Sequence, residues 1–191
     1  MTALVTLPPH ESKHFTVTDV QRMADAGMFD NGERVELLEG ELVVVSPQSP
    51  AHFSVIDEIA ERLRHAFDFG MHVRQQAPLL CGPYSAPEPD VSVVRGHRRD
   101  YVTRHPQGAD CVLAVEVAVT SQSMDRAKAE IYARADVSEY WLVDLPSSQL
   151  TRYARPDGSR AYLQVDTLSA QDFLTGVGVG EAIRVGDLLI D

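Results

Sequence analysis

The chain has 191 residues, of which 44% are hydrophobic and 24% charged, so it can bury a substantial core in one domain. Its net charge of −11 argues against binding nucleic acid over the whole surface, but it suits a site that gathers carboxylates around a cation. The sequence contains no run of roughly 18 apolar residues and no basic segment leading into an apolar one at its start. Cys81 and Cys111 lack the spacing of metal ligands. We therefore expect a cytoplasmic protein with reduced thiols and no membrane partner.

The N-terminal part is predicted to be an arm followed by a helix. Residues 1–14 contain a Pro-Pro pair among polar neighbours and are expected to be loose, which leaves residues 15–191 as a single domain. Thr16 and Asp19 have the spacing of a capping box, and an apolar stripe follows them. Gly27 is expected to end this helix.

A hairpin and a longer helix are predicted next. Apolar residues flank Glu39-Gly40 within residues 34–46, which is typical of two strands joined by a tight turn. Ser49-Pro50 combines a good N-cap with proline at the first helical position. Apolar residues then recur with a period of about 3.6 and predict a helix that continues to Gly70.

The remaining elements are mostly strands. Residues 71–76 and 90–94 have β character. Residues 112–144 read as an apolar strand, an amphipathic helix and a second apolar strand, the pattern of a β-α-β unit. Residues 149–165 form a second hairpin around Pro-Asp-Gly, and residues 185–190 are expected to be a short helix or strand. The predicted fold is mixed α/β, with a central mixed sheet flanked by helices and hairpins in its N- and C-terminal parts.

One carboxylate stands out within the β-α-β unit. Glu116 interrupts a strand that is otherwise apolar, and a buried lone charge costs several kcal/mol unless a cation compensates it. The following helix carries Lys128, one of only two lysines beside 15 arginines. An ammonium is a compact point charge that arginine cannot imitate. This bias suggests that Lys128 serves ammonium chemistry.

Two further carboxylates lie at the ends of predicted strands. Glu36 sits between apolar residues of the first hairpin, and Asp90 follows Pro89 where a strand begins. Carboxylates at strand ends can bind a hard divalent cation together with a backbone carbonyl and water. Such an ion activates water and stabilises charge on a phosphoryl group, and a nearby ammonium can assist. Asp90, Glu116, Glu36 and Lys128 are therefore the predicted catalytic residues.

At this point the chain resembles the PD-(D/E)XK nuclease superfamily, and more closely the Uma-two family of restriction-endonuclease-like proteins. The resemblance spans nearly the whole chain. It rests on an ordered set of motifs: Phe15-Thr16-Val17, Arg34 to Glu41, Ser46-Pro47, His52, Pro89-Asp90, Glu116-Val117-Ala118, Asp125, Lys128, Tyr132, Glu139-Tyr140-Trp141 and Asp144.

The resemblance implies a restriction-endonuclease-like core that holds Mg²⁺ or Mn²⁺. It implies Asp90, Glu116 and the carbonyl of Val117 as metal ligands, with Glu36 as a further carboxylate nearby. The usual superfamily lysine lies two positions after the glutamate, where this chain has Ala118. The family pattern instead places it on the next helix, at Lys128.

These features predict a divalent-metal-dependent nuclease that acts on DNA, with the superfamily suggesting a homodimer. Two alternatives stay open: a binding module for nucleic acid or protein that keeps the fold without activity, and a metal-dependent hydrolase of small phosphate esters. An arginine-rich loop follows the strand after Asp90 and is the first candidate for phosphate contacts. Its candidate residues are Arg95, Arg98, Arg99 and Arg104.

Overall fold

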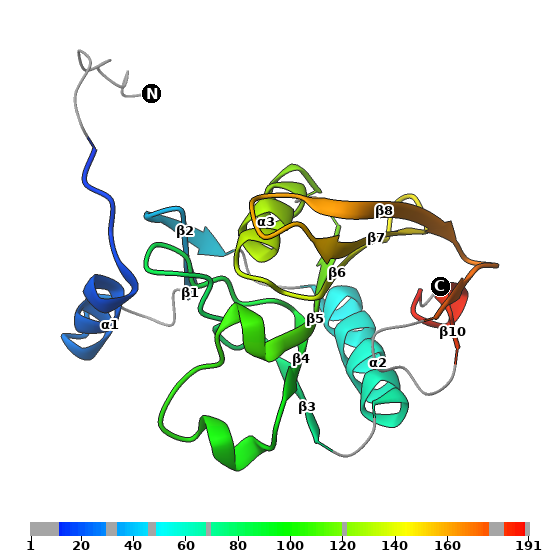
Figure 1. Cartoon of the computed structure of the whole chain (residues 1–191), viewed down its shortest axis with the longest axis horizontal. Coiled ribbons are helices and arrows are strands. Elements are labelled where there is room, and N and C mark those ends of the chain that lie inside the picture. The colour runs from blue at the N-terminus through cyan, green and yellow to red at the C-terminus, as the bar shows by residue number, and fades with distance from the viewer. Residues whose placement is uncertain are drawn as a thin grey trace.

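A six-stranded mixed sheet forms the centre of the computed structural model, which describes residues 12–29, 34–45, 49–67, 70–119, 122–175 and 182–189. Neighbouring strands are antiparallel except for the central pair β5 and β6, which is parallel. This confirms the predicted mixed sheet (Figure 1). In spatial order the strands are β3 (Met71–Gln75), β4 (Val91–Arg95), β5 (Cys111–Ala118), β6 (Glu139–Asp144), β7 (Gln149–Pro156) and β8 (Tyr162–Ser169).

The predicted β-α-β unit is present. Helix α3 (Gln122–Arg134) connects β5 to β6 and packs against the sheet. The turn after α3 contains Asp136 in the left-handed region, with φ of 59°. Aspartate is one of the residues that tolerate this conformation. The unit therefore brings Glu116 and the α3 side chains together on one side of the sheet.

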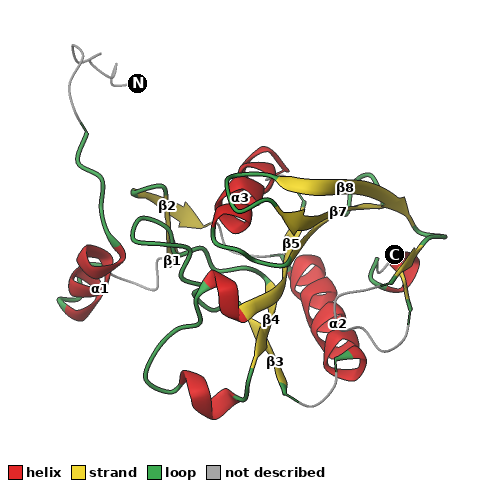
Figure 2. Cartoon of the chain, viewed as in Figure 1, coloured by secondary structure: helices red, strands yellow, loops and turns green. Residues whose placement is uncertain are grey.

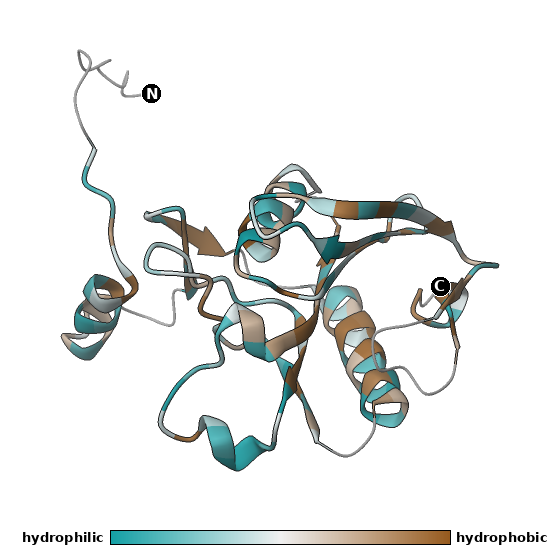
Figure 3. Cartoon of the chain, viewed as in Figure 1, coloured by the Kyte–Doolittle hydropathy of each residue, from teal (hydrophilic) through white to brown (hydrophobic). Residues whose placement is uncertain are grey.

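Two helices cover opposite faces of the sheet (Figure 2). Helix α2 (Pro50–Ala66) begins at the N-cap Ser49, as predicted, and packs on the face to which Val115 and Val117 point. Alternate residues of a strand point to opposite faces, so Ala114 and Ala118 join the core beneath α3. Figure 3 shows brown, apolar segments along the central strands and along one side of α2. By the same alternation, Glu116 points into the α3 layer.

The first hairpin forms a small sheet of its own. Strands β1 (Arg34–Leu38) and β2 (Glu41–Val45) meet at Glu39 and Gly40, whose φ values of 51° and 86° are those of a type I′ turn. Backbone hydrogen bonds from Ala86 to Leu37 and from Gly40 to Tyr84, both 2.7 Å, fix the hairpin to the loop before β4. This attachment carries Glu36 towards the main sheet.

The two helices in the N-terminal half begin as predicted, but α2 ends earlier than the sequence suggests. Helix α1 (Val17–Asp25) has the predicted capping box at Thr16. The loose-arm prediction for residues 1–14 falls mostly outside the described residues, and His14 Nδ1 lies 2.9 Å from the Glu39 carbonyl oxygen. Helix α2 ends at Ala66, before the expected Gly70, because Phe67 has extended backbone.

The C-terminal part is the least regular. Strands β9 (Phe173–Leu174) and β10 (Ile183–Arg184) form a short pair, followed by a 3₁₀ helix at Val185–Asp187. Val185 and Leu188 pack beneath α2. Of the two alternatives for residues 185–190 the structure has the helix, although residue 190 lies outside the described part. Among the described residues, no helix is long and apolar enough to cross a membrane.

Candidate functional site

Lys128 is the centre of a buried charge cluster. Its Nζ lies 2.9 Å from Glu36 Oε2 and 3.0 Å from Glu116 Oε1. All three residues are about 5% exposed. The hydroxyl of Tyr132, one helical turn after Lys128, donates to Glu116 Oε1 at 2.8 Å. Residues from β1, β5 and α3, which are far apart in the sequence, therefore share one ammonium group.

Asp90 is brought to the same cluster by strand register. Val91 pairs with Val115 across β4 and β5, so the next positions outward are Asp90 and Glu116. Opposed residues of antiparallel strands have Cβ atoms about 5 Å apart. Asp90 Oδ2 accepts a hydrogen bond from the Val117 amide at 2.9 Å, and Asp90 is 8% exposed. The structure thus joins the two carboxylates that the sequence predicts as metal ligands.

His52 completes the cluster from the first turn of α2. Its Nε2 lies 3.4 Å from Asp90 Oδ2. The nearby carboxylate of Asp90 raises the pKa of His52, and the backbone carbonyl of Val117 adds to this effect. The side chains of His52 and Asp90 are 17% and 11% exposed, against 6% for those of Lys128 and Glu116. The edge of the cluster at His52 is therefore its least buried edge.

The cluster contains more negative than positive charge. Burial raises the pKa of Glu116 to about 8, and the nearby charges of Asp90 and Glu36 add to this effect although Lys128 opposes it. Burial by itself would lower the pKa of Lys128, but the attraction of Glu116 and Glu36 outweighs it and raises this pKa. Lys128 is therefore a fixed cation, whereas Glu116 needs either a proton or additional positive charge.

The donor chemistry fits a hard divalent cation. The implied ligands Asp90, Glu116 and the Val117 carbonyl are all oxygen donors, which Mg²⁺ and Mn²⁺ prefer. Within the described residues, no three Asp, Glu, His or Cys side chains already surround a common point in the manner of a metal cage. Lys128 instead supplies positive charge beside these oxygens, and His52 adds to it when protonated. A bound cation would take over part of that role.

Lys128 approaches Glu116 on the side of β5 to which residue 118 also points. Ala118 occupies the position two residues after Glu116, and it is completely buried in the core beneath α3. A lysine there would point to the same side of β5 as Glu116. Lys128 reaches that carboxylate from α3. The expectation that the helical lysine can reach the strand is confirmed.

The four candidate arginines are not near this cluster. Asp90 and Arg95 lie at opposite ends of β4, about 17 Å apart at roughly 3.4 Å per residue. Arg95 donates to the Ala109 carbonyl at 2.6 Å, and Arg104 contacts Asp110 at 2.8 Å. The sequence interpretation assumed that the loop lies near Asp90 because it follows the same strand. The length of β4 instead places the loop far from Asp90. All four candidate residues are exposed: Arg95, Arg98, Arg99 and Arg104.

Two residues of the cluster were undervalued from the sequence. Neither His52 nor Tyr132 was among the predicted catalytic or metal-binding residues, yet both contact the acidic residues. For Tyr132 a signal was present, because it lies four residues after Lys128 and therefore on the same helix face. For His52 the family pattern was the only signal, since its contact with Asp90 depends on tertiary structure.

Comparison with known proteins identifies the family. The profile of the Uma2 (Uma-two) family, described as "Putative restriction endonuclease", matches residues 17–184. The chain belongs to the Uma2 family. A solved structure from Anabaena variabilis, described as a "putative nuclease belonging to DUF820", superposes on this Uma2 chain with a TM-score of 0.74. The two are 12% identical, and the match covers 91% of this chain and 97% of the other, so it shows the fold. No curated protein matches the sequence.

Proposed function

We propose that this Uma2 chain is a divalent-metal-dependent nuclease that hydrolyses phosphodiester bonds in DNA. One observation carries the proposal: a fixed ammonium, that of Lys128, lies against Glu36 and Glu116 in a cluster that also contains Asp90. Packing alone gives no reason to bury three carboxylates with one lysine, because each buried ion costs several kcal/mol. A site that handles a cation and a phosphate does give a reason.

Asp90, Glu116 and the Val117 carbonyl would hold Mg²⁺ or Mn²⁺. When bound, the ion would lower the pKa of water and neutralise charge on the phosphoryl oxygens. Glu36 shares the ammonium of Lys128 with Glu116 and so keeps this side chain extended across the site. The ammonium of Lys128 would donate hydrogen bonds to a phosphoryl oxygen or orient the attacking water.

Two further residues hold the acidic groups in position. The Tyr132 hydroxyl donates to Glu116, and the Val117 amide donates to Asp90. Both hydrogen bonds restrict the orientation of the carboxylates that they contact. His52 stands at the more exposed edge beside Asp90. Its raised pKa makes it a source of positive charge where a phosphate would enter.

The test is cleavage of plasmid DNA with Mg²⁺ or Mn²⁺. Asp90→Asn and Lys128→Ala should each reduce the rate by about a hundredfold or more, the usual cost of losing one preorganised charge contact. Asp157→Asn and Lys13→Ala are matched controls, because both residues are exposed and lie outside the cluster. Robust cleavage by both site variants would exclude this cluster as the source of activity.

The two alternatives give different results in the same assay. A non-catalytic binding module would retain DNA without cleaving it in either metal. A small phosphoesterase would hydrolyse a chromogenic diester but not plasmid, single-stranded DNA or RNA. The buried charge cluster favours catalysis over simple binding, because a binding surface needs accessible positive charge rather than a buried acidic site.

We also propose a cytoplasmic homodimer. The buried free thiols of Cys81 and Cys111 suit a reducing compartment. Burial raises the pKa of Cys111 to about 12, so this thiol is not reactive. Two copies would supply the two sites needed to cut both strands of a duplex. Sedimentation equilibrium of the full chain tests the dimer, and a single monomeric species at micromolar concentration would contradict it.

A further inference from the structure

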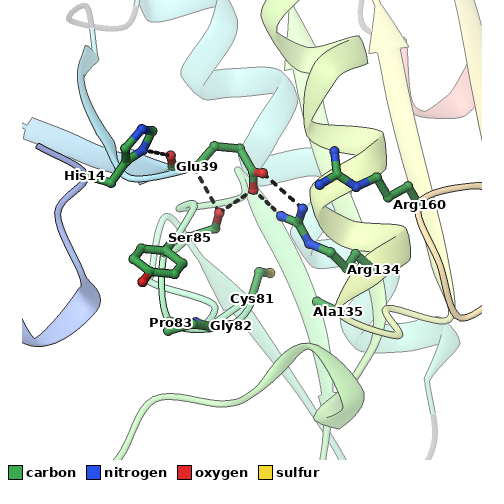
Figure 4. Close-up of a pocket in the computed structure, with 10 residues that line it drawn as sticks. His14, Glu39, Cys81, Gly82, Pro83, Ser85, Arg134, Ala135 and Arg160 are labelled. Atoms are coloured by element: carbon green, nitrogen blue, oxygen red, sulfur yellow. Dashed lines mark hydrogen bonds and ion pairs between the residues drawn. The ribbon is translucent and has the colours of Figure 1, made fainter. Parts of the chain in front are cut away.

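A second polar site lies in a pocket of about 620 Å³ at the turn of the first hairpin (Figure 4). Its walls come from the β1–β2 turn, the loop of residues 81–85, the end of α3 and the connection between β7 and β8. This volume is typical of small-molecule sites. The pocket contains none of the acidic cluster residues.

One ion pair crosses the pocket. Arg134 Nη1 donates to Glu39 Oε2 at 3.0 Å, and its Nη2 contacts the other carboxylate oxygen. Ser85 Oγ also donates to Glu39 Oε1, at 2.9 Å. The side chains of Arg134 and Glu39 are 32% and 47% exposed, so solvent reaches both. Glu39 thus occupies the donor groups that an anion from solution would use.

A second arginine faces this pair without a direct partner. The guanidinium of Arg160 is directed at Glu39 and Arg134 in Figure 4. Within the part of the chain that the structure describes, Arg160 makes no hydrogen bond or ion pair, and it acts on Glu39 only through space. Two arginines therefore converge on one carboxylate, which leaves a local excess of one positive charge in a protein of net charge −11.

We propose that this pocket binds a backbone phosphate of nucleic acid, through Arg160 and through the part of Arg134 that Glu39 does not hold. Guanidinium groups match phosphate with paired hydrogen bonds. Tyr84, which also lines the pocket and is 49% exposed, offers a ring face on which a base can stack. Arginines beside an exposed aromatic ring are the composition of a nucleotide-binding surface rather than of a site for a bare anion.

The pocket lies within reach of a strand bound at the acidic cluster. Both sites lie along the first hairpin and α3. Glu36 of β1 and Lys128 belong to the cluster, and Glu39 of the β1–β2 turn and Arg134 belong to the pocket. Three residues of strand span about 10 Å, and six residues of helix span about 9 Å. Along the axis of a DNA duplex, this separation equals roughly three nucleotide steps at 3.4 Å each. The inference rests on the proposed nuclease function and supplies the phosphate contact that the loop after β4 does not provide near the cluster.

Binding is to be measured by fluorescence anisotropy with a short labelled single-stranded DNA and EDTA, so that cleavage plays no part. Arg160→Gln should weaken binding about tenfold, the factor for one charge-assisted contact, and should reduce the salt slope by about one. Arg155→Gln is the matched control, since Arg155 is also exposed and lies in β7 outside the pocket. Equal affinities for wild type and both variants would overturn the proposal.

A second variant separates binding from damage to the fold. Glu39→Gln should strengthen binding, because it frees Arg134 while the amide can still accept from Ser85. Structural damage would weaken binding in both variants, so a loss of affinity with a Glu39→Gln protein that is folded at the assay temperature would contradict the proposal. Competition by inorganic phosphate or a mononucleotide, without any effect of Arg160→Gln on DNA, would overturn nucleic acid as the ligand.

The outcome is distinguishable from that of the nuclease proposal. DNA binding that depends on Arg160, with no cleavage in Mg²⁺ or Mn²⁺, supports the pocket and rejects the nuclease. Cleavage that depends on Asp90, with DNA affinity independent of Arg160, rejects the pocket and supports the nuclease.

Discussion

Replacing Lys128 with methionine should destabilise the protein by about 3–5 kcal/mol. Methionine keeps most of the side-chain volume but removes the ammonium that contacts Glu36 and Glu116 at 2.9 and 3.0 Å. The two carboxylates are about 5% exposed, so water cannot replace the lost partner. Removing one member of a buried ion pair usually costs this amount because the other charge stays buried.

Urea unfolding followed by tryptophan fluorescence measures the loss. Lys13→Met is the matched control, because Lys13 is the other lysine of the chain and its side chain is 73% exposed, 3.9 Å from Asp19. This control should change the free energy of unfolding by less than about 0.5 kcal/mol. Adding Glu116→Gln to Lys128→Met should restore part of the stability, since one uncompensated carboxylate is then removed. A Lys128→Met protein as stable as the control would refute this account of the cluster.

A divalent cation gives the same variant a second test. If Asp90 and Glu116 hold Mn²⁺, the ion replaces charge that the variant lacks. A ligand at about one hundred times its dissociation constant stabilises the folded state by about 2.7 kcal/mol. Mn²⁺ should therefore raise the unfolding midpoint of Lys128→Met more than that of Lys13→Met. Equal shifts in both variants would show that the ion binds elsewhere.

Two smaller changes probe the hydrogen bonds around the two sites. Tyr132→Phe removes the 2.8 Å donor to Glu116 and should cost about 1.5–3 kcal/mol in urea unfolding, the range for a bond to a charged group. Glu39 has a pKa below its ordinary 4.5, chiefly because Arg134 donates to it. Its contribution to stability is therefore present above pH 4.5 and is lost as the pH falls through the lower folded-state pKa. Glu39→Gln should flatten the decrease of melting temperature in that acidic range.

Controls for these two changes come from neighbouring residues. Tyr153→Phe also removes a tyrosine hydroxyl, but Tyr153 contacts its neighbours through its ring, which stacks on Tyr140 at 5.3 Å. Tyr153→Phe should lower the free energy of unfolding by less than about 0.5 kcal/mol. Arg134→Gln should flatten the acid profile as Glu39→Gln does, and the double variant should add nothing further. Additive effects would show that the two residues act separately.

Local patterns predicted most of the fold. The capping box at Thr16, the N-cap at Ser49 and the turn at Glu39-Gly40 each depend on residues within a few positions, so the sequence contains the whole signal. The β-α-β unit was equally clear, because hydrophobic residues recur with a different period in strands and in helices. The end of α2 was misplaced because its last apolar residues suit a helix, whereas Phe67 adopts extended backbone.

The sequence predicted the parts of the site that contain an unusual residue for their position. It did not predict the contacts that depend on the tertiary structure. A carboxylate in an apolar strand needs a partner, which led from Glu116 to Lys128, and the structure confirms this contact. No local rule places His52 beside Asp90, or sends the Arg95 loop to the far end of β4. The metal and DNA roles of these residues stay predictions.

The distance along the chain between the members of the cluster has a consequence for folding. Glu36 and Lys128 are 92 residues apart, and Glu116 reaches Asp90 only across the β4–β5 pair. Contacts between such distant segments require closure of long loops, and they form after the local elements. A slip of β4 by one residue would turn Asp90 to the other face of the sheet. The acidic cluster should therefore appear last during refolding, and a chain released part-way through folding carries no assembled site.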